Sequence, residues 1–412
     1  MRIGVAATRL GDVDGVSFEA IKWRRVLDGL GHQVYSCAGA LGHEPDGTLI
    51  REMHFTHRPA ALVSQAAFDL TSDGATVRAE VARQAGALRR RLEQWLAAHS
   101  LDMLIVQNAW AIPMHLPLGL ALARLVRDTG IPTIGHHHDY WWERERFADT
   151  VVPDILDDAF PPDLPSVRHV SINTLAADDL RRRRGLASTV IPNVFDFDQQ
   201  LPDNLADRAR LLRTEVRLPP TGLLAVQPTR VVPRKGIELA IELLARLGRP
   251  DSMLLITSPA GDEGAGYLVE LRQLAGRLGV DMRYGANRFQ PDGGGEAHGP
   301  AHSLAEAYVA ADVITYPSLY EGFGNALVEA VFFRKLLVVN RYPVYEADIR
   351  PLGFRFIELD GVVTHDVLEQ LRTALADPDR RAADGEHNWQ LGRRHFSYER
   401  LERSIRELLR GL

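Results

Sequence analysis

The stretch DVITYPSLYEGFGNALVEA, from Asp312 to Ala330, contains a complete change of local structure. Val313 to Tyr316 is a short apolar run, which favours a buried strand, and Pro317 ends it. Gly322 and Gly324 then allow a sharp turn, after which the chain continues with helical character. A strand, a glycine turn and a helix in this order are typical of α/β proteins.

The same alternation of short apolar runs and longer amphipathic segments occupies both halves of the chain. Strands are predicted at 2–7, 33–38, 101–108, 131–138, 166–173 and 188–193, and again at 223–229, 252–258, 280–286, 312–317 and 335–341. Continuous apolar strands separated by helices indicate parallel sheets that are covered on both faces. The sequence therefore predicts two doubly wound, Rossmann-like α/β domains.

The domain boundary is expected where this alternation stops. Residues 191–220 are rich in Asp, Asn and Pro and contain one short helical candidate. We therefore predict a first domain at 1–195, a linker at 196–220 and a second domain at 221–390. The glycine-rich segment 290–302 is interpreted as a surface connection or a mobile lid. Ligands of open α/β sheets bind beyond the carboxyl ends of the strands, so two facing domains would form a cleft.

Composition excludes several classes of protein. The chain has 412 residues and a formal net charge of −6, so no overall basic field attracts nucleic acid. Its single cysteine, Cys37, excludes an intramolecular disulfide and a cysteine-rich zinc module, which favours the reducing cytoplasm. No run of about 18 apolar residues predicts a transmembrane helix, and peripheral membrane contact is not favoured.

A basic loop follows the first strand of the second half. Within QPTRVVPRKG, Arg230 and Lys235 come just after the strand, and Gly236 opens the next helix. Two cations beside the free N–H groups of a helix start suit a diphosphate. The alternative is an ordinary helix start, since Lys and Arg are common there.

Two carboxylates flank the glycine turn. Glu321 precedes the glycines and Glu329 follows them, and Gly322 and Gly324 let backbone N–H groups approach a ligand. Carboxylates accept hydrogen bonds from sugar hydroxyls, so one could hold a hexose and the other a ribose. The alternative is that Glu321 caps helix N–H groups while Glu329 is a solvated helix residue.

The first half has an unusual segment, TIGHHHDYWWERERF. Adjacent side chains of a strand alternate faces, so the three histidines 136–138 cannot all ligate one ion, and no metal site is predicted. His138 and Asp139 are expected at the end of a strand. Trp141 offers a face against which a sugar could stack, or packs in the core. Arg144 could bind an anionic acceptor, or pair with neighbouring glutamates.

Together these motifs resemble the retaining glycosyltransferases of family 4, which have the two-domain GT-B architecture. The resemblance rests on EGFGNALVE with Glu321 and Glu329, on the pair Arg230 and Lys235, and on the His-Asp step at residue 138. IPNVFD at 191–196 resembles the turn that ends the first domain of such enzymes. Residues 391–412 resemble a terminal segment that packs back on that domain.

The resemblance implies transfer of a glucose- or mannose-type hexose from a nucleoside-diphosphate sugar to an acceptor hydroxyl. Arg230 and Lys235 would stabilise the leaving diphosphate, Glu321 would hold the hexose and His138 would bond a hexose hydroxyl. Further donor contacts would come from Gly15, Gly322, Phe323, Gly324, Asn325 and Glu329, the last of these with the ribose. Asp139, Trp141 and Arg144 would contact the acceptor.

The resemblance also implies that no metal or other cofactor is needed, and that the donor is a UDP- or GDP-sugar. Two alternatives stay open: a nucleotide-sugar-binding regulatory subunit without activity, and a sugar phosphorylase or epimerase on a GT-B scaffold. The sequence does not determine the base, the donor sugar, the acceptor, the linkage or the oligomeric state.

Overall fold

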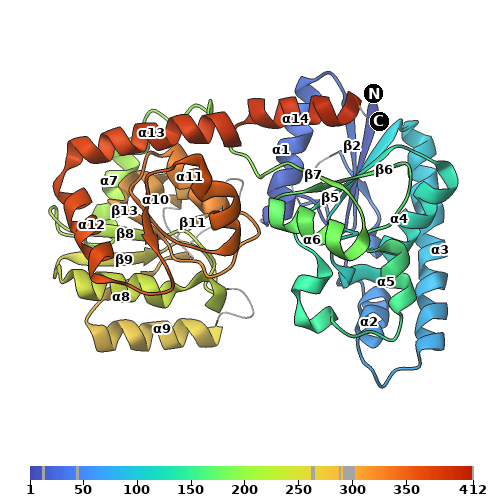
Figure 1. The fold of residues 1–412 in the computed structure, drawn as a ribbon, viewed down its shortest axis with the longest axis horizontal. Coiled ribbons are helices and arrows are strands. Elements are labelled where there is room, and N and C mark those ends of the chain that lie inside the picture. The colour runs from blue at the N-terminus through green and yellow to red at the C-terminus, as the bar shows by residue number, and fades with distance from the viewer. Residues whose placement is uncertain (12–13, 43–45, 261–264, 287–288, 291–301, 411–412) are drawn as a thin grey trace. The chain divides into compact units, whose positions relative to one another are not determined.

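The computed structural model describes the whole chain except residues 12–13, 43–45, 261–264, 287–288, 291–301 and 411–412. Most of the predicted surface loop or lid at 290–302 therefore lies outside the described residues. The chain divides into two compact units: Met1–Asn193 with Tyr398–Leu412, and Val194–Ser397. Each unit is built on its own parallel sheet with helices around it, which confirms the predicted α/β class (Figure 1).

The first unit contains a seven-stranded sheet in the order β3-β2-β1-β4-β5-β6-β7, with all neighbours parallel. Its strands are β1 (Arg2–Ala7), β2 (Gln33–Ala38), β3 (Thr48–Leu49), β4 (Met103–Gln107), β5 (Thr133–His137), β6 (Val167–Ser171) and β7 (Ser188–Val190). The central strands β4 and β5 are buried along their whole length, as expected for a sheet covered on both faces.

Two groups of helices cover this sheet. One face packs Ala6, Leu104 and Val106 against α2 (Arg58–Ala67), α3 (Gly74–His99), α4 (Leu116–Thr129) and α5 (Pro153–Ala159). The opposite face carries α1 (Gly15–Gly29), whose Trp23 ring lies 4.5 Å from the ring of His136. The remaining helix between strands is α6 (Thr174–Arg184). Side chains that leave β5 therefore enter different surroundings on the two faces.

The C-terminal helix α14 (Tyr398–Arg410) belongs to the first unit and packs against α1. Leu401, Ile405 and Leu408 are its buried apolar residues, spaced three or four residues apart on one helical face. The guanidinium of Arg25 on α1 lies over the ring of Tyr398 at 5.2 Å, within the range of a cation–π contact.

The second unit contains a six-stranded parallel sheet in the order β10-β9-β8-β13-β14-β15. Its strands are β8 (Leu223–Gln227), β9 (Ser252–Ile256), β10 (Asp281–Tyr284), β13 (Val313–Tyr316), β14 (Leu337–Asn340) and β15 (Ile357–Leu359), beside a small pair of β11 (Phe289–Gln290) and β12 (His302–Ser303). β8 and β13 are neighbours, although one ends long before the other begins in the sequence.

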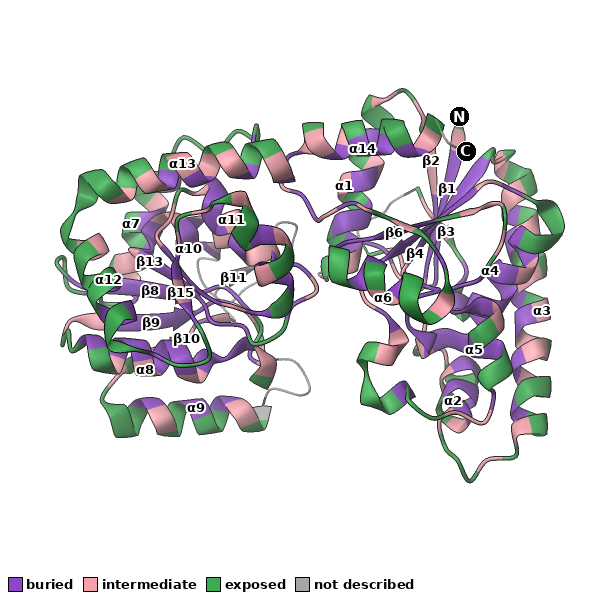
Figure 2. Ribbon diagram, in the orientation of Figure 1, coloured by how far each residue is buried: buried purple, intermediate pink, exposed green. Residues whose placement is uncertain are grey.

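Seven helices of this unit are described: α7 (Leu205–Glu215), α8 (Ile237–Leu247), α9 (Ala265–Leu278), α10 (Leu304–Ala310), α11 (Asn325–Phe332), α12 (His365–Ala376) and α13 (Pro378–Phe396). Figure 2 shows buried strands flanked by helices whose outer sides are exposed. None of the described helices is long and apolar enough to cross a membrane.

The segment 196–220, predicted as a linker, is instead part of the second compact unit. It contains α7, which packs against α10. Arg208 pairs with Glu306 at 2.6 Å, and Arg213 pairs with Asp312 at 3.0 Å. The Asp- and Pro-rich composition marked a change of structure, but these side chains tie the segment to the second sheet. The division falls at Asn193 and again at Ser397.

Candidate functional site

The basic loop of the second unit connects β8 to α8 and is held tightly against the neighbouring loop. Gly236, the residue before α8, has φ +58°, and a Cβ there would meet the backbone oxygen of Pro317 at 2.3 Å. Only glycine fits both conditions. Gln227 at the end of β8 donates to the hydroxyl of Thr229 at 3.0 Å and anchors the start of the loop.

Lys235 and Glu321 form a buried ion pair across this junction. Both side chains are about nine-tenths buried, at 10% and 9% exposure, and the Lys235 ammonium donates to Glu321 Oε1. Arg234 donates to Glu321 Oε2 at 3.0 Å and to the backbone oxygen of Tyr320 at 3.0 Å. They meet because β8 and β13 are adjacent, so that the loops after them share one edge of the sheet.

This cluster has more positive than negative charge. Arg230 is exposed at the same loop, so three cations (Arg230, Arg234 and Lys235) stand around the one carboxylate of Glu321. Burial alone would raise the pKa of Glu321, but Lys235 and Arg234 favour the carboxylate and hold that pKa below its usual value. Burial lowers the pKa of Lys235, assisted by Arg234 and Arg230 and opposed by Glu321. Such a cluster can accept a further anion.

The glycine turn is required by the local backbone conformation. Gly324 has φ +141°, and a Cβ at this position would lie 2.5 Å from the Tyr342 hydroxyl oxygen. That hydroxyl donates to the backbone oxygen of Phe323 at 2.6 Å. Gly324 precedes α11, and no described side chain caps the first N–H groups of that helix. Glu321 is therefore a counter-ion to Lys235 rather than the helix cap that was the alternative.

Glu329 lies inside α11 and is half-buried. Its Oε2 accepts a hydrogen bond of 2.7 Å from the hydroxyl of Tyr308, a fully buried residue of α10. The same hydroxyl lies 3.1 Å from the backbone oxygen of Ala326. Glu329 is thus oriented by a neighbouring helix and is not the solvated residue of the alternative interpretation. Gly322 and Asn325 are half-buried at this turn, and Phe323 is buried.

In the first unit, the loop after β1 ends in a helix cap. Asp14 accepts hydrogen bonds from the N–H groups of Val16 (3.0 Å) and Ser17 (3.1 Å), and it pairs with Arg9 at 3.0 Å. These bonds satisfy N–H groups that the first turn of α1 leaves free. Gly15 is the first residue of α1 and is exposed.

His138 and Asp139 directly follow β5, and Asn108 after β4 holds both. The Asn108 side-chain oxygen accepts from the His138 N–H at 2.9 Å, and its amide nitrogen donates to Asp139 at 3.3 Å. Asn108 has φ +56°, a left-handed conformation that Asn tolerates better than most residues. Burial, partly offset by Asp139 and Asp14, lowers the pKa of His138 to about 4, so its ring is neutral near pH 7.

The other two histidines divide between the faces of the sheet as the alternation predicts. The His136 ring lies 4.6 Å from that of His138, tilted by 47°, on the face of Trp23. His137 Nε2 lies 3.0 Å from His169 Nδ1 on the opposite face. Both ring nitrogens of His136 and Nε2 of His138 are buried, and none of the three has a hydrogen-bond partner among the described residues. No group of three potential metal ligands occurs among the described residues.

The residues predicted for the acceptor have partners of their own. Trp141 is half-buried against the core, and its indole N–H donates to the backbone oxygen of Phe160 at 3.0 Å. The Arg144 guanidinium pairs with Asp139 rather than with the neighbouring glutamates of the alternative interpretation. The acceptor roles of Asp139, Trp141 and Arg144 stay a prediction.

No protein-family model matches the chain. The mannosylglucosylglycerate synthase of Thermotoga maritima, however, is 33% identical to it, and the match covers 98% of either chain. The chain belongs to the family 4 glycosyltransferases. The synthase of the same name from Petrotoga mobilis is 32% identical to this glycosyltransferase, over 87% of the chain and 86% of the relative.

Among solved structures, Anabaena HepE in complex with UDP-glucose matches the glycosyltransferase over 100% of both chains, with a TM-score of 0.68 and 15% identity. This likeness agrees with the predicted GT-B fold. The predicted activity is confirmed at the level of its class: the protein is a hexosyltransferase that uses a nucleotide sugar.

Two residues of these loops were not singled out from the sequence of this glycosyltransferase. Arg234 stands beside Lys235 in VVPRKG, and the doubled cation before a glycine was the available signal. Asn108 ends a predicted strand, and an Asn at that point is a common sign of a left-handed residue. Neither partner, Glu321 nor His138, could be assigned without the order of the strands.

Proposed function

We propose that this family 4 glycosyltransferase transfers a mannose- or glucose-type hexose from a UDP- or GDP-sugar to an acidic sugar acceptor. We propose further that it retains the anomeric configuration and needs no metal. The observation that carries the proposal is the surplus of positive charge around Glu321, where Arg230, Arg234 and Lys235 gather. A diphosphate leaving group supplies the two missing negative charges, and its departure develops more charge that these cations stabilise.

The donor roles follow from the contacts of the second unit. The Glu321 carboxylate offers about four lone-pair positions, and the hydroxyls of Ser318 and Tyr316 approach it besides the two basic partners. Hexose hydroxyls would bond this carboxylate by taking the place of these two hydroxyls. Glu329, oriented by Tyr308, accepts the ribose hydroxyls. The N–H groups of Phe323 and Gly324 lie just before α11, a helix that none of the described side chains caps, and they donate to the hexose. Gly322 and Asn325 complete this turn.

The first unit contributes His138 and the loop at Gly15. A neutral imidazole has one donor and one acceptor nitrogen. Nε2 of His138 has no hydrogen-bond partner in the described part of the chain, so it can bond a hexose hydroxyl. Asn108 holds the backbone of His138 and positions the ring. The proposed retaining chemistry has the acceptor hydroxyl attack the anomeric carbon, while the leaving diphosphate takes the hydroxyl proton.

The acceptor class is suggested by the two relatives that match most of the chain. Both are named for a glycerate that carries glucose and mannose. A glycerate has a carboxylate, so we propose glucosylglycerate, or a sugar acid like it, as the acceptor.

The experiment combines a binding screen with an activity panel. Thermal unfolding with UDP, GDP and ADP identifies the nucleotide, because a ligand of the folded state raises its apparent stability. UDP-glucose and GDP-mannose are then incubated with glucosylglycerate, products are identified by mass spectrometry, and the anomeric configuration is read by NMR. A parallel reaction in EDTA tests the metal. Stabilisation by no nucleotide, together with no product from either donor, would refute the proposal.

A further inference from the structure

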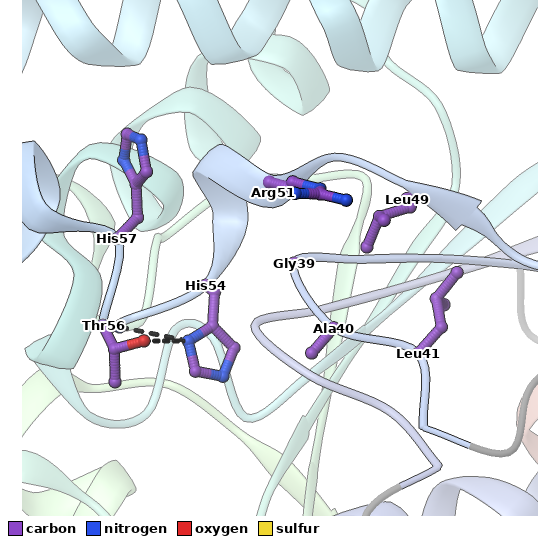
Figure 3. A pocket seen from close by; sticks show the side chains of 8 residues that line it. All are labelled: Gly39, Ala40, Leu41, Leu49, Arg51, His54, Thr56 and His57. Atoms are coloured by element: carbon purple, nitrogen blue, oxygen red, sulfur yellow. Dashed lines mark hydrogen bonds between the residues drawn. The ribbon is translucent and has the colours of Figure 1, made fainter.

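An open pocket of about 450 Å³ lies in the first unit beside the carboxyl ends of β2 and β3. It is not part of the site described above. Figure 3 shows it between the backbone at Gly39–Leu41 and the segment that leads from β3 into α2. Its lining residues are Gly39, Ala40, Leu41, Leu49, Arg51, His54, Thr56 and His57. The carboxyl edge of a parallel sheet is where α/β proteins bind ligands.

The described lining is basic on one side and apolar on the other. Arg51, His54 and His57 are its ionisable residues, and no carboxylate is among them. Arg51 is exposed, and within the described part of the chain it makes no ion pair. The nearest carboxylate in sequence, that of Glu52, points to Arg91 at 3.6 Å. Arg51 is therefore available to an anionic ligand, and a guanidinium can bind a carboxylate through two parallel hydrogen bonds.

Hydrogen bonds within the segment also orient His54. The N–H of Thr56 donates to His54 Nδ1 at 3.2 Å, and the Thr56 hydroxyl lies 2.6 Å from the same nitrogen. Since Nδ1 is an acceptor, the neutral ring carries its hydrogen on Nε2. His57 precedes the ten-residue helix α2, and no side chain of the described residues caps its first turn. The pocket therefore offers hydrogen-bond donors beside its cation.

The pocket is fixed by close backbone packing and joined to the loop near His138. A Cβ on Gly39 would lie 2.0 Å from the backbone nitrogen of His54. The backbones at Gly39 and His54 can therefore pack this closely only because residue 39 is a glycine. The Arg9 guanidinium lies 5.2 Å over the ring of Phe55 and pairs with Asp14, whose charge acts on His138. Three strand spacings separate β2 from β5, roughly 14 Å.

We propose that this pocket binds the carboxylate end of an acidic sugar acceptor, with Arg51 as the principal cation and His57 as a hydrogen-bond donor. The inference rests on the proposed function, because it requires an acidic acceptor. Leu41 and Leu49 form the apolar side of the pocket, against which the carbon skeleton of the acid lies. The strand spacing leaves room for a sugar unit between the carboxylate and the reacting hydroxyl.

The test compares an acid with its neutral analogue. Glucosylglycerate and glucosylglycerol differ in the carboxylate, which is a hydroxymethyl group in the second. Arg51→Gln should raise KM for the acid at least about tenfold, the loss expected for one charged hydrogen-bonded contact, and leave KM for the neutral analogue within about twofold. Arg51→Lys keeps the charge and should recover part of the loss.

Arg58→Gln is the matched control, since Arg58 is an exposed cation seven residues away that does not line the pocket. It should not distinguish the two acceptors. Equal effects of the two substitutions, or an equal rise of KM for acid and neutral analogue in Arg51→Gln, would overturn the proposed pocket while leaving the transferase intact.

Failure of the proposed function has a different signature, namely no transfer to either acceptor by the wild-type protein. Calorimetric titration with glucosylglycerate then reads the pocket directly, with and without the nucleoside diphosphates. Binding to wild type and Arg58→Gln but not to Arg51→Gln would support the pocket even without transfer. Absence of binding to the wild type in every titration would overturn it.

Discussion

Glu321→Gln provides the sharpest test of the charge cluster in the second unit. The substitution keeps the size of the side chain and removes its charge. Lys235 and Arg234 then lose the carboxylate that they share, while Arg230 stays nearby. The variant should be less stable than the wild type, because a buried cation without a counter-ion is costly.

The size of the effect can be worked from burial. Removing one partner of a buried ion pair costs about 3–5 kcal/mol. Two features reduce this: Arg234 is 41% exposed, so solvent screens its charge, and Lys235 can lose its proton because its pKa is already lowered. We expect a loss of about 3 kcal/mol, or roughly 6–12 °C in the midpoint of a unit of this size.

Thermal unfolding followed by circular dichroism measures the loss, with and without nucleoside diphosphate. The diphosphate supplies the missing negative charge, so the gap between variant and wild type should narrow as the nucleotide is added. The matched control is Glu386→Gln, which breaks a surface pair with Arg334 of the same unit. Exposed pairs of this kind contribute about 0–1 kcal/mol, so little change is expected.

Two results would refute this reasoning. If Glu321→Gln were as stable as Glu386→Gln, Glu321 would not be the buried counter-ion of Lys235. If the variant lost stability but the gap did not narrow with any nucleotide, the cluster would be structural only, and the assignment of the diphosphate to it would be wrong.

Three other predictions concern single sites. Asn108→Ala should lower kcat about tenfold or more without weakening nucleotide binding, because the backbone of His138 loses its hydrogen bond to Asn108. Asn108→Gly loses the same bond but adopts φ +56° without strain, so it separates the two effects. Steady-state kinetics measure kcat and thermal shift measures nucleotide binding; unchanged kcat in both variants would contradict the prediction. Gly324→Ala should destabilise the second unit by roughly 2–4 kcal/mol in a denaturant titration, because alanine is strained at this positive φ and its Cβ would clash with the Tyr342 hydroxyl. Adding Tyr342→Phe removes the hydroxyl, so it should recover the stability lost to the clash but not the stability lost to the backbone strain. Burial lowers the pKa of His115 to about 4 from the usual 6.5, so between these pH values the unfolded state binds a proton that the folded state excludes. The free energy of unfolding should therefore fall as pH drops from about 6.5 towards 4, by about 1.4 kcal/mol per pH unit for each such histidine. His115→Gln should flatten a plot of unfolding free energy against pH.

Periodicity was sufficient to predict both sheets. The apolar runs that precede Gly236 and Gly324 are strands, and the segments after these glycines are helices, because burial on both faces requires unbroken apolar strands. Periodicity did not locate the boundary between the units. The Asp- and Pro-rich segment around α7 resembles a linker by composition, while its place in the second unit depends on ion pairs with residues about a hundred positions away.

The charged residues of the cluster could also be predicted from the sequence, since cations before a helix and carboxylates at a glycine turn are local patterns. The sequence did not predict which of these residues pair with one another. The interpretation of Glu321 as a helix cap was reasonable from spacing, because a carboxylate near a helix start is favourable by itself. The roles of Arg234 and Asn108 were not predicted, because the sequence around each residue does not show which distant residue it contacts.

By itself, the sequence determined the fold class, the strand–turn–helix units and the kinds of side chain that follow each strand. Only the tertiary structure decided which of these side chains meet. Lys235 and Glu321 are 86 residues apart in the chain, yet they pair because β8 and β13 are neighbours in the sheet. Asn108 holds His138 because β4 lies beside β5. Strand order is set by packing of the whole unit, and local sequence carries little information about it.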